Sequence, residues 1–174
     1  NVEQLIDISR VAGLDKIRTT QWPGIQAISE LAVDTLSSLT AQDLAFRIAP
    51  RFNASGRLGD AEIALTALTT RHSGRAAEVA KQLDRINGER QRLEREVLDE
   101  IETRLPSMAE LASRRSLVVT GTGWHRGILG IIASKLLEKY RRPVLVLDVE
   151  DGIAMGSGRS IPGFNLYKAL RKLE

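Results

Sequence analysis

The sequence predicts an α/β fold with a helical N-terminal portion, a long connector helix and then a small mixed α/β sheet domain. Short amphipathic segments punctuated by Pro and Gly fill residues 1–75, and one apolar stripe at three- and four-residue steps marks residues 76–105. Residues 106–174 change to short apolar runs separated by one helical pattern. Of 174 residues, 43% are hydrophobic and 27% charged, which is the composition of a globular rather than a disordered chain.

Start signals predict the first helices. Pro23 suits the first turn of a helix over residues 25–31, because proline lacks the amide hydrogen that a first turn leaves unbonded. Thr40 and Asp43 have the spacing of a capping box, in which each side chain accepts a hydrogen bond from the other residue's backbone amide. A second helix is therefore predicted over residues 44–49.

Pro50 is expected to end that helix, because its ring clashes with the preceding turn. Residues 52–59 contain two glycines, an asparagine and a serine, so they predict an irregular loop. Asp60 then has the right chemistry to cap a further helix over residues 61–70.

The long helix is predicted from its apolar stripe. The residues of the stripe are Val79, Leu83, Ile86, Leu93, Val97, Ile101 and Leu105. The other faces carry Arg–Glu and Arg–Asp pairs in neighbouring turns, which stabilise an exposed helix. Gly88 and Arg90 interrupt the stripe, so a connector along or between two domains is favoured over a coiled coil. Pro106 ends the helix.

The remaining chain predicts a strand–helix–strand unit followed by a hairpin and a last helix. The elements are a strand over 116–120, a helix over 128–140, a strand over 143–149, a third strand over 153–156 and a helix over 164–173. A strand–helix–strand connection makes a parallel pair with a right-handed crossover. The apolar run at 143–149 is typical of a strand buried on both faces, and Asp151-Gly152 predicts the hairpin turn.

Composition excludes several classes of protein. The chain has no cysteine and two histidines, which rules out a disulfide scaffold, a thiolate metal site and a multi-histidine metal cage. It has no apolar run of membrane-spanning length and no signal-peptide pattern, so we expect a cytoplasmic protein without a membrane partner. Residues 106–174 carry 11 Lys/Arg and 6 Asp/Glu, a net charge of +5, whereas the first 105 residues carry 14 and 16, a net charge of −2. This asymmetry favours an anionic partner for the C-terminal part.

The first motif with binding chemistry lies at residues 50–58. Arg51, Asn53 and Arg57 flank a predicted flexible loop that leads into the helix capped by Asp60. Arginine forks match phosphate oxygens, and glycine lets the backbone approach a ligand. The alternative is a surface loop with solvated arginines.

The second motif joins the first predicted strand to its helix, at residues 120–127. Free amides at a helix N-terminus bind anions, and Trp124 and His125 could stack on a base and donate to a phosphate, beside Gly127. Its glycines follow the spacing GxGxxxG, one residue away from the dinucleotide fingerprint, so a nucleotide-cofactor site is one alternative. A tryptophan that covers the core is the other.

The third motif consists of Gly156 followed by Ser157, Gly158, Arg159 and Ser160. Backbone amides, two hydroxyls and a guanidinium within a few residues predict a cradle for an oxyanion. The motif lacks the lysine of a P-loop, which disfavours hydrolysis of nucleoside triphosphates. A glycine-rich turn without a ligand is the alternative.

Taken together, the segments PRFNASGRLGD (50–60), GWHRGILGIIAS (123–134) and GSGRSIPG (156–163) resemble the RecJ-type single-stranded-DNA exonucleases of the DHH phosphoesterase superfamily. The resemblance covers nearly the whole chain. It implies that residues 1–75 are the C-terminal part of a DHH catalytic domain. It also implies that 76–105 are the connecting helix and that 106–174 are the start of the DHH-associated, nucleic-acid-binding domain.

The resemblance also implies a function and roles for the motif residues. The parent enzyme would remove nucleotides from the 5′ end of single-stranded DNA in repair and recombination, by hydrolysis that depends on manganese or magnesium. The residues of the first motif would hold the phosphate near the scissile bond. Those of the other two motifs would bind the DNA strand, with Ser157, Gly158 and Arg159 gripping a phosphate.

The sequence has neither an Asp-His-His triplet nor an Asp-x-Asp near its start, the metal-binding patterns of the family. We therefore expect no bound metal and no metal-ligating residues in this chain, which would bind DNA backbone without hydrolysing it. Two alternatives stay open: another DHH-type phosphoesterase that acts on short RNA or cyclic dinucleotides, and a nuclease-dead DNA-binding scaffold. Single-stranded DNA is the expected partner, with replication and repair proteins, and a second copy paired through an exposed edge of the truncated sheet, as further candidates.

Overall fold

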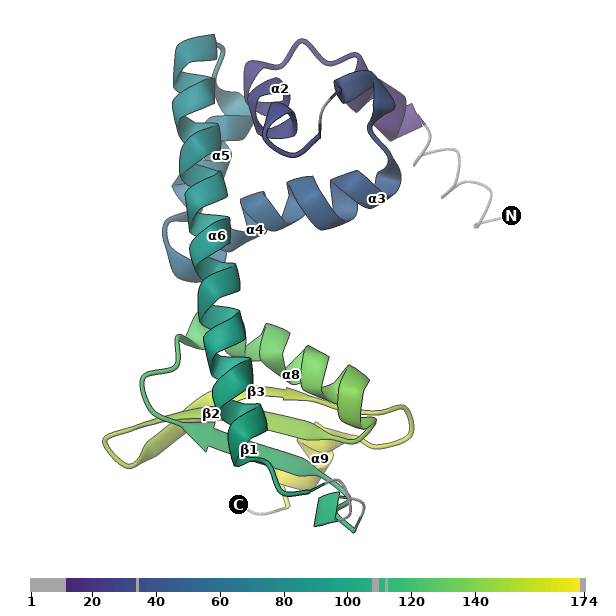
Figure 1. Ribbon diagram of the computed structural model, residues 1–174, viewed down its shortest axis with the longest axis vertical. Helices are drawn as coiled ribbons and strands as arrows, with labels where there is room; N and C mark the ends of the chain where they lie inside the picture. Colours follow the sequence, from purple (N-terminus) through teal and green to yellow (C-terminus); the bar gives the residue numbers. More distant parts are fainter. Residues whose placement is uncertain (1–11, 34, 108–109, 112, 173–174) are drawn as a thin grey trace. The chain divides into compact units, whose positions relative to one another are not determined.

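The structure is a computed structural model that describes residues 12–33, 35–107, 110–111 and 113–172 (Figure 1). The chain divides into two compact units, the first ending at Arg90 and the second beginning at Gln91. Helix α6 (Ser73–Arg104) runs without interruption through the boundary. Among the described residues, no helix combines the length and the apolar character that crossing a membrane would require.

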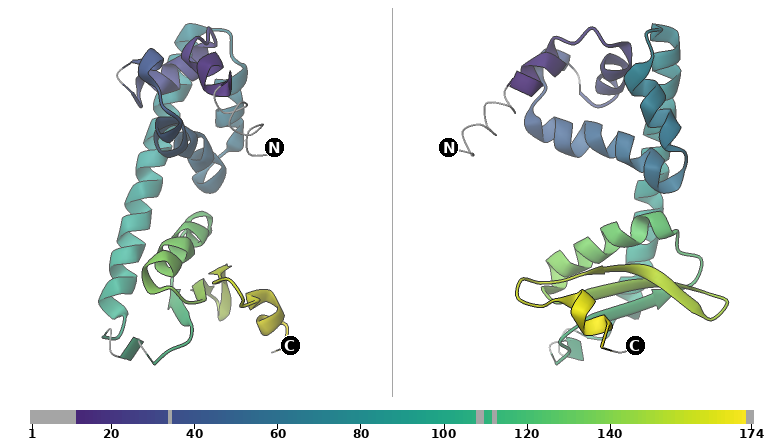
Figure 2. Two further views of the ribbon diagram at one scale, coloured as in Figure 1. Left: turned by 90° about the vertical axis from the view of Figure 1, so that its right-hand side faces the viewer. Right: turned by 180° about the vertical axis from the view of Figure 1, so that it is seen from behind.

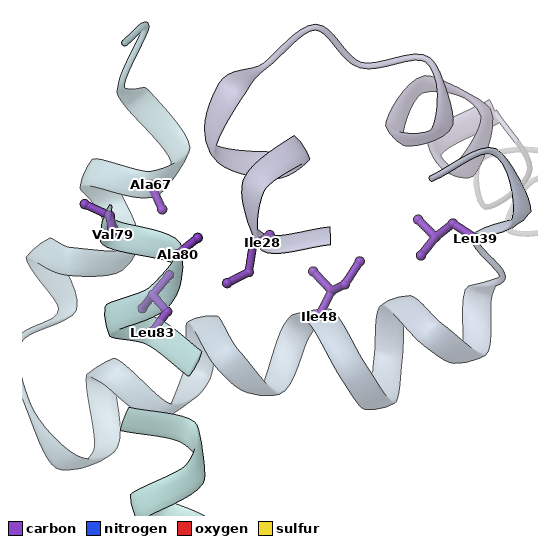
Figure 3. Close-up of a cluster of buried hydrophobic side chains, with 7 residues drawn as sticks. All are labelled: Ile28, Leu39, Ile48, Ala67, Val79, Ala80 and Leu83. Atoms are coloured by element: carbon purple, nitrogen blue, oxygen red, sulfur yellow. The ribbon is translucent and has the colours of Figure 1, made fainter. Parts of the chain in front are cut away.

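The first unit consists of helices. They are α2 (Pro23–Glu30), the 3₁₀ turn η1 (Leu36–Ser38), α3 (Ala41–Asp43), the π-helical segment η2 (Leu44–Ile48), α4 (Ala49–Leu58), α5 (Ala61–Thr69) and the first half of α6. Their facing sides enclose a small apolar core, drawn in Figure 3, that consists of Ile28, Leu39, Ile48, Ala67, Val79, Ala80 and Leu83. Removal of these side chains from water is the main favourable contribution to the stability of this unit.

The predicted helix starts are confirmed. At Thr40 the hydroxyl accepts a hydrogen bond from the Asp43 amide (3.1 Å), and the Asp43 carboxylate accepts one from the Thr40 amide (3.1 Å), which completes the capping box. Hydrogen bonds from the Thr40 hydroxyl and amide stabilise the carboxylate and lower the pKa of Asp43. Asp60 caps α5 by accepting a hydrogen bond from the Glu62 amide (2.8 Å).

The predictions that Pro50 ends a helix and that residues 52–59 form a loop are wrong. Pro50 lies in the first turn of α4, which continues from η2 to Leu58. In η2 the Ala49 amide donates to the Leu44 carbonyl, five residues back, and this wider turn accommodates a proline that would clash with the tighter α-helical turn. Asn53, Ser55 and Gly56 are therefore helical residues.

The predicted long helix forms, and its apolar stripe is buried in both units. Val79 and Leu83 belong to the core of the first unit, whereas Val97 and Ile101 are buried in the second. On the exposed faces the predicted pair of Arg92 with Glu96 forms, with 2.5 Å between nitrogen and oxygen.

The second unit is a three-stranded mixed sheet with helices, which confirms the predicted α/β fold class. Its elements are β1 (Leu117–Gly121), α8 (Arg126–Tyr140), β2 (Val144–Glu150), β3 (Ile153–Arg159) and α9 (Leu166–Leu170). The strand order is β1-β2-β3, with β1 parallel to β2 and β2 antiparallel to β3 (Figures 1 and 2). The predicted crossover helix is α8, and Asp151-Gly152 forms the hairpin turn with positive φ at both residues.

The two faces of this sheet differ. Helix α8 packs on one face, where Val144 and Val146 of β2 are fully buried. On the other face Leu145 lies near Leu166 of the short helix α9, and Val118 stays 54% exposed. The prediction that residues 143–149 are buried on both faces therefore holds for one face only. The last helix is also shorter than predicted, because Asn165 caps it and only the turn of residues 166–170 is helical.

Strand β3 is longer than the predicted 153–156, and it includes Gly156 to Arg159 of the third motif. Gly156 to Arg159 pair with Leu147 to Val144 of β2, so these residues are extended and do not form a turn. At Gly156 a Cβ atom would lie 1.9 Å from the Val146 carbonyl oxygen. The glycine is there because the backbones of β2 and β3 approach closely, and not because a turn requires it.

Substitution by alanine is expected to have opposite effects on stability at two glycines. A Cβ at Gly24 in α2 would lie 1.6 Å from the Ala67 carbonyl oxygen of α5, whereas a Cβ at Gly88 in α6 would contact nothing within 4 Å. We expect Gly24→Ala to lower the free energy of unfolding by about 1–3 kcal/mol through overpacking. Gly88→Ala should raise it by about 0.5–1 kcal/mol through helix propensity. Urea denaturation followed by circular dichroism measures both, and equal effects of the two substitutions would contradict the α2–α5 packing.

Candidate nucleic-acid interface

Ser157 and Arg159 lie on the face of β3 that points toward α8, because alternate residues of a strand share a face. The Arg159 Nε donates to the Ser134 hydroxyl of α8 (3.1 Å), and Nη1 donates to the Ser157 hydroxyl (3.2 Å) and to the Gly158 carbonyl (2.8 Å). We call Ser134, Ser157 and Arg159 the arginine–serine cluster. It joins helix α8, which begins within the second predicted motif, to the third motif.

The cluster depends on small residues in α8. Gly127, Gly130 and Ser134 are spaced three and four residues apart and so lie along one face of the helix. A Cβ at Gly130 would lie 3.1 Å from Nη2 of Arg159 and 3.3 Å from the Ser157 hydroxyl. The Ser134 hydroxyl donates to the Gly130 carbonyl (3.0 Å), which orients its oxygen to accept from Arg159. A larger residue at position 130 would push the guanidinium outward.

The electrostatics of the cluster favour an anionic ligand. Arg159 is exposed, and within the described part of the chain it makes no ion pair with a carboxylate. All of its hydrogen-bond partners are neutral oxygens, and its Nη2 has no partner among the described residues. A guanidinium that keeps its full charge and a free nitrogen suits a phosphate oxygen.

The structure separates the other residues of the third motif from this cluster. Gly158 points to the opposite face of the sheet, where a Cβ would lie 2.7 Å from Leu166. The Ser160 hydroxyl donates to the Phe164 carbonyl (2.7 Å) and stabilises the turn before α9. Ser157 and Arg159 are thus the two side chains of the motif that meet.

Trp124 has a structural role in this conformation. Its side chain is 4% exposed, its indole N–H donates to Glu100 of α6 (2.8 Å), and its backbone amide donates to the buried carboxylate of Asp148 (3.0 Å). The ring lies against Gly121, where a Cβ would come within 2.1 Å of it. This arrangement fits the alternative that the tryptophan covers the core, and the ring offers no open face to a base.

His125 is the N-cap of α8. Its Nδ1 accepts a hydrogen bond from the Gly127 amide (3.1 Å), so that one of the free amides predicted to bind an anion is already bonded. The imidazole is exposed, and the neighbouring Arg126 forms an ion pair with Glu150 (3.0 Å). His125 remains accessible to a ligand, although the helix start it caps is less open than the sequence predicts.

In the first unit the three predicted phosphate-binding residues do not converge. Arg51 is largely buried: its Nε pairs with Asp84 of α6 (2.8 Å), and its other nitrogens donate to the carbonyls of Arg47 and Leu31. Asn53 and Arg57 are exposed and one helical turn apart on α4. Residues two positions apart point to different sides of a helix, which separates Arg51 from Asn53.

Sequence reasoning missed Ser134, Gly130 and Asp148. Asp148 is 5% exposed and fixes the loop before α8 by accepting from Trp124 and pairing with Arg126 (3.8 Å). A signal for Gly130 and Ser134 was present, since small residues at positions 127, 130 and 134 interrupt an otherwise apolar helix pattern. Their partner strand was not predictable, because β3 was expected to end before Ser157.

Within the described ranges, no three His, Asp or Glu side chains lie close enough together to hold a metal ion.

Residues 114–174 match the DHHA1 domain family. The chain is 36% identical over 160 residues to the single-stranded-DNA-specific exonuclease RecJ of Bacillus subtilis, covering 91% of this chain and 20% of that protein. For the protein of the same name from Escherichia coli the identity is 36% over 169 residues, covering 93% and 29%. The chain therefore spans less than a third of the length of these relatives.

Solved structures give the same result. The crystal structure of RecJ in complex with Mg²⁺ from Thermus thermophilus matches with a TM-score of 0.78 at 34% identity, covering 92% of this chain and 24% of that chain. A structure of exonuclease RecJ bound to manganese matches with a TM-score of 0.76 at 34% identity, covering 91% and 38%. Both the sequence and the backbone thus agree with one stretch of these proteins.

Because Glu100 accepts a hydrogen bond from the Trp124 indole, we expect its substitution to cost more stability than substitution of Glu96, another glutamate of α6. Glu100→Ala leaves the part-buried indole N–H without its acceptor and should cost about 1–3 kcal/mol of stability. Glu96→Ala removes only the exposed pair with Arg92 and should cost less than about 1 kcal/mol. Urea denaturation of both variants checks this, and the arrangement of Trp124 is wrong if the two costs are the same.

Proposed function

Because this chain corresponds to a segment of RecJ along more than nine tenths of its own length, we propose that it serves as part of a 5′–3′ exonuclease for single-stranded DNA. The reaction would be metal-dependent hydrolysis of phosphodiester bonds in DNA repair and recombination. The names of the relatives support the single-stranded substrate, and the motifs at 50–60, 123–134 and 156–163 support the family assignment.

The contribution of this segment to that reaction is to hold phosphate groups. The observation that carries the proposal is the exposed Arg159 guanidinium, which among the described residues has only neutral oxygens as partners and one unbonded nitrogen, beside Gly130. The hydroxyls of Ser134 and Ser157 hold it in place, so little side-chain entropy would be lost on binding. A phosphate oxygen would take the free Nη2, and the Ser157 hydroxyl would rotate to donate to the same group.

We assign residues 1–75 to the end of the DHH catalytic domain, 76–105 to the connecting helix and 106–174 to the beginning of the DHH-associated domain. On the catalytic side, Asn53 and Arg57 would face the strand from the exposed surface of α4. Arg51 would support that helix through Asp84 rather than contact the phosphate itself. His125 would contribute from the start of α8.

The metal ions of the proposed reaction supply an activated water and stabilise charge on the phosphate. The RecJ structures with Mg²⁺ and Mn²⁺ support these two metals for the family. We propose that the part of this chain in the reaction is to bind and orient the strand, through the guanidinium of Arg159.

Further partners follow from the same assignment. We place the protein in the cytoplasm, with replication and repair proteins as additional candidates. Strands β1 and β3 each have one edge that no described strand covers, and such an edge could pair with a second copy of the chain.

The role of Arg159 is tested by titrating labelled single-stranded DNA with this chain. Arg159→Ala should weaken binding about tenfold, the scale of a lost charged hydrogen bond, and should lower the slope of affinity against salt by about 0.7. Arg159→Lys keeps the charge but loses the forked guanidinium, so its affinity for DNA should lie between those of the unchanged chain and of Arg159→Ala. Arg75→Ala, an exposed arginine of the first unit, is the control. Unchanged binding by Arg159→Ala would remove the cluster from the interface.

Catalysis by this chain alone can be tested directly. The chain incubated with single-stranded DNA and Mn²⁺ or Mg²⁺ should release no nucleotides above the level of a heat-denatured sample, because its described residues do not form a metal site. Gel electrophoresis of an end-labelled strand measures this. Metal-dependent degradation that purifies with the chain and is lost in Arg159→Ala would contradict the assignment of a binding role alone.

A further inference from the structure

A hollow at one end of the sheet in the second unit lies outside all three motifs except at its rim. Its volume is about 540 Å³, and it is open to solvent. The residues that line it are Arg114, Arg115, Ser116, Arg141, Arg142, Pro143, Ile161 and Phe164. They come from the starts of β1 and β2 and from the loop between β3 and α9, and no lining residue is acidic. We call it the four-arginine hollow.

Two of its arginines are available to a ligand. Arg115 and Arg141 are exposed, and their side chains make no hydrogen bond or ion pair with any described residue. Arg114 interacts with the carboxylate of Glu110. Four guanidinium groups around one hollow that has no acidic residue in its described lining repel one another, and an anion would relieve that repulsion.

The backbone at the hollow is held in place by its other arginine. Arg142 donates to the carbonyls of Tyr140 (3.0 Å) and Arg114 (2.7 Å), and also to that of Leu111, so it fixes the chain before β1 against the end of α8. Arg141 has a φ of 52°, a left-handed conformation for which glycine is the usual residue. The helix dipole favours a cation at this position, but it does not account for Arg114 and Arg115 on the facing segment.

The remaining wall is apolar and partly aromatic. Phe164 is 44% exposed and lies with Ile161 and Pro143 on the rim. An exposed aromatic ring beside guanidinium groups provides stacking for a base next to contacts for a phosphate. An acidic peptide would use the arginines without needing the ring, so this combination favours a single-stranded nucleic acid.

The hollow adjoins the arginine–serine cluster. Arg159 is the register partner of Val144, the residue that follows Pro143 of the hollow, and Ile161 is only two residues beyond Arg159. Two residues of extended chain span about 7 Å at most. A strand whose phosphate contacts Arg159 would therefore have its neighbouring nucleotides within reach of the hollow.

We propose that the four-arginine hollow is a second subsite for the same single strand, with Arg115 and Arg141 on phosphate oxygens and Phe164 stacked on a base. This inference rests on the proposed function, because it extends the strand that the arginine–serine cluster binds. The second subsite makes affinity depend on strand length, since a strand confined to the cluster leaves the hollow empty.

The test compares thymidine oligonucleotides of about 5 and about 20 nucleotides, lengths that bracket the site sizes of single-strand binding modules. For the double variant R115A/R141A we expect about tenfold weaker binding of the long strand and a salt slope lower by about 1.4. Phe164→Ala should weaken binding of the long strand about tenfold, as loss of one stacked base does, and should leave the slope of affinity against salt unchanged. The control R75A/K81A removes two exposed cations of the first unit and should change binding less than about twofold.

The outcomes separate this inference from the proposed function. If Arg159→Ala weakens binding while R115A/R141A and Phe164→Ala do not, the second subsite is wrong and the proposed function stands. If the chain binds neither strand, both are wrong. If R115A/R141A weakens binding of polyglutamate as much as that of DNA and Phe164→Ala has no effect on DNA, the hollow binds acidic polypeptide instead. Thermal denaturation verifies that each variant remains folded.

Discussion

The close contact between helix α8 and strand β3 is the constraint on which the candidate interface depends. Arg159 reaches Ser134 only because residue 130 has no side chain, and Ser157 shares the face because strand residues alternate. The position of β3 also depends on its other neighbour, because the missing Cβ at Gly156 lets β3 lie close to β2. Glycines that look like the marks of a flexible turn thus serve a rigid arrangement, which holds one guanidinium ready for an anion.

Local signals predicted the elements wherever the interaction that forms them lies within a few residues. The capping box of Thr40 and Asp43 and the Asp60 cap need only their own backbone, and both are found as predicted. The strand–helix–strand unit was predicted correctly from its apolar runs. The single crossover helix α8 connects the parallel strands β1 and β2 that these runs form. The long helix was predicted correctly from its apolar stripe, although residues of that stripe are buried in two separate units.

Predictions failed where the preceding turn or a paired strand overrides the preference of the residues themselves. Pro50 and Gly56 argue for a loop, but the wide turn η2 accommodates the proline and places residues 52–58 in a helix. The third motif reads as a turn because it is rich in glycine, whereas pairing with β2 makes it a strand. Both errors changed the site. A helix separates Arg51 from Asn53, and a strand sends Gly158 to the face opposite Arg159.

The charge asymmetry that first indicated an anionic partner acquires a sharper form in the structure. Several cations of the second unit are paired with carboxylates and contribute little field of their own. These pairs include Arg92–Glu96, Arg104–Glu100, Arg126–Glu150, Lys135–Glu94 and Lys139–Glu102. Arg115, Arg141 and Arg159 have no such partner among the described residues, and they gather where β2 begins and β3 ends. The position of the unmatched guanidinium groups, more than the net charge, indicates the surface along which a polyanion would lie.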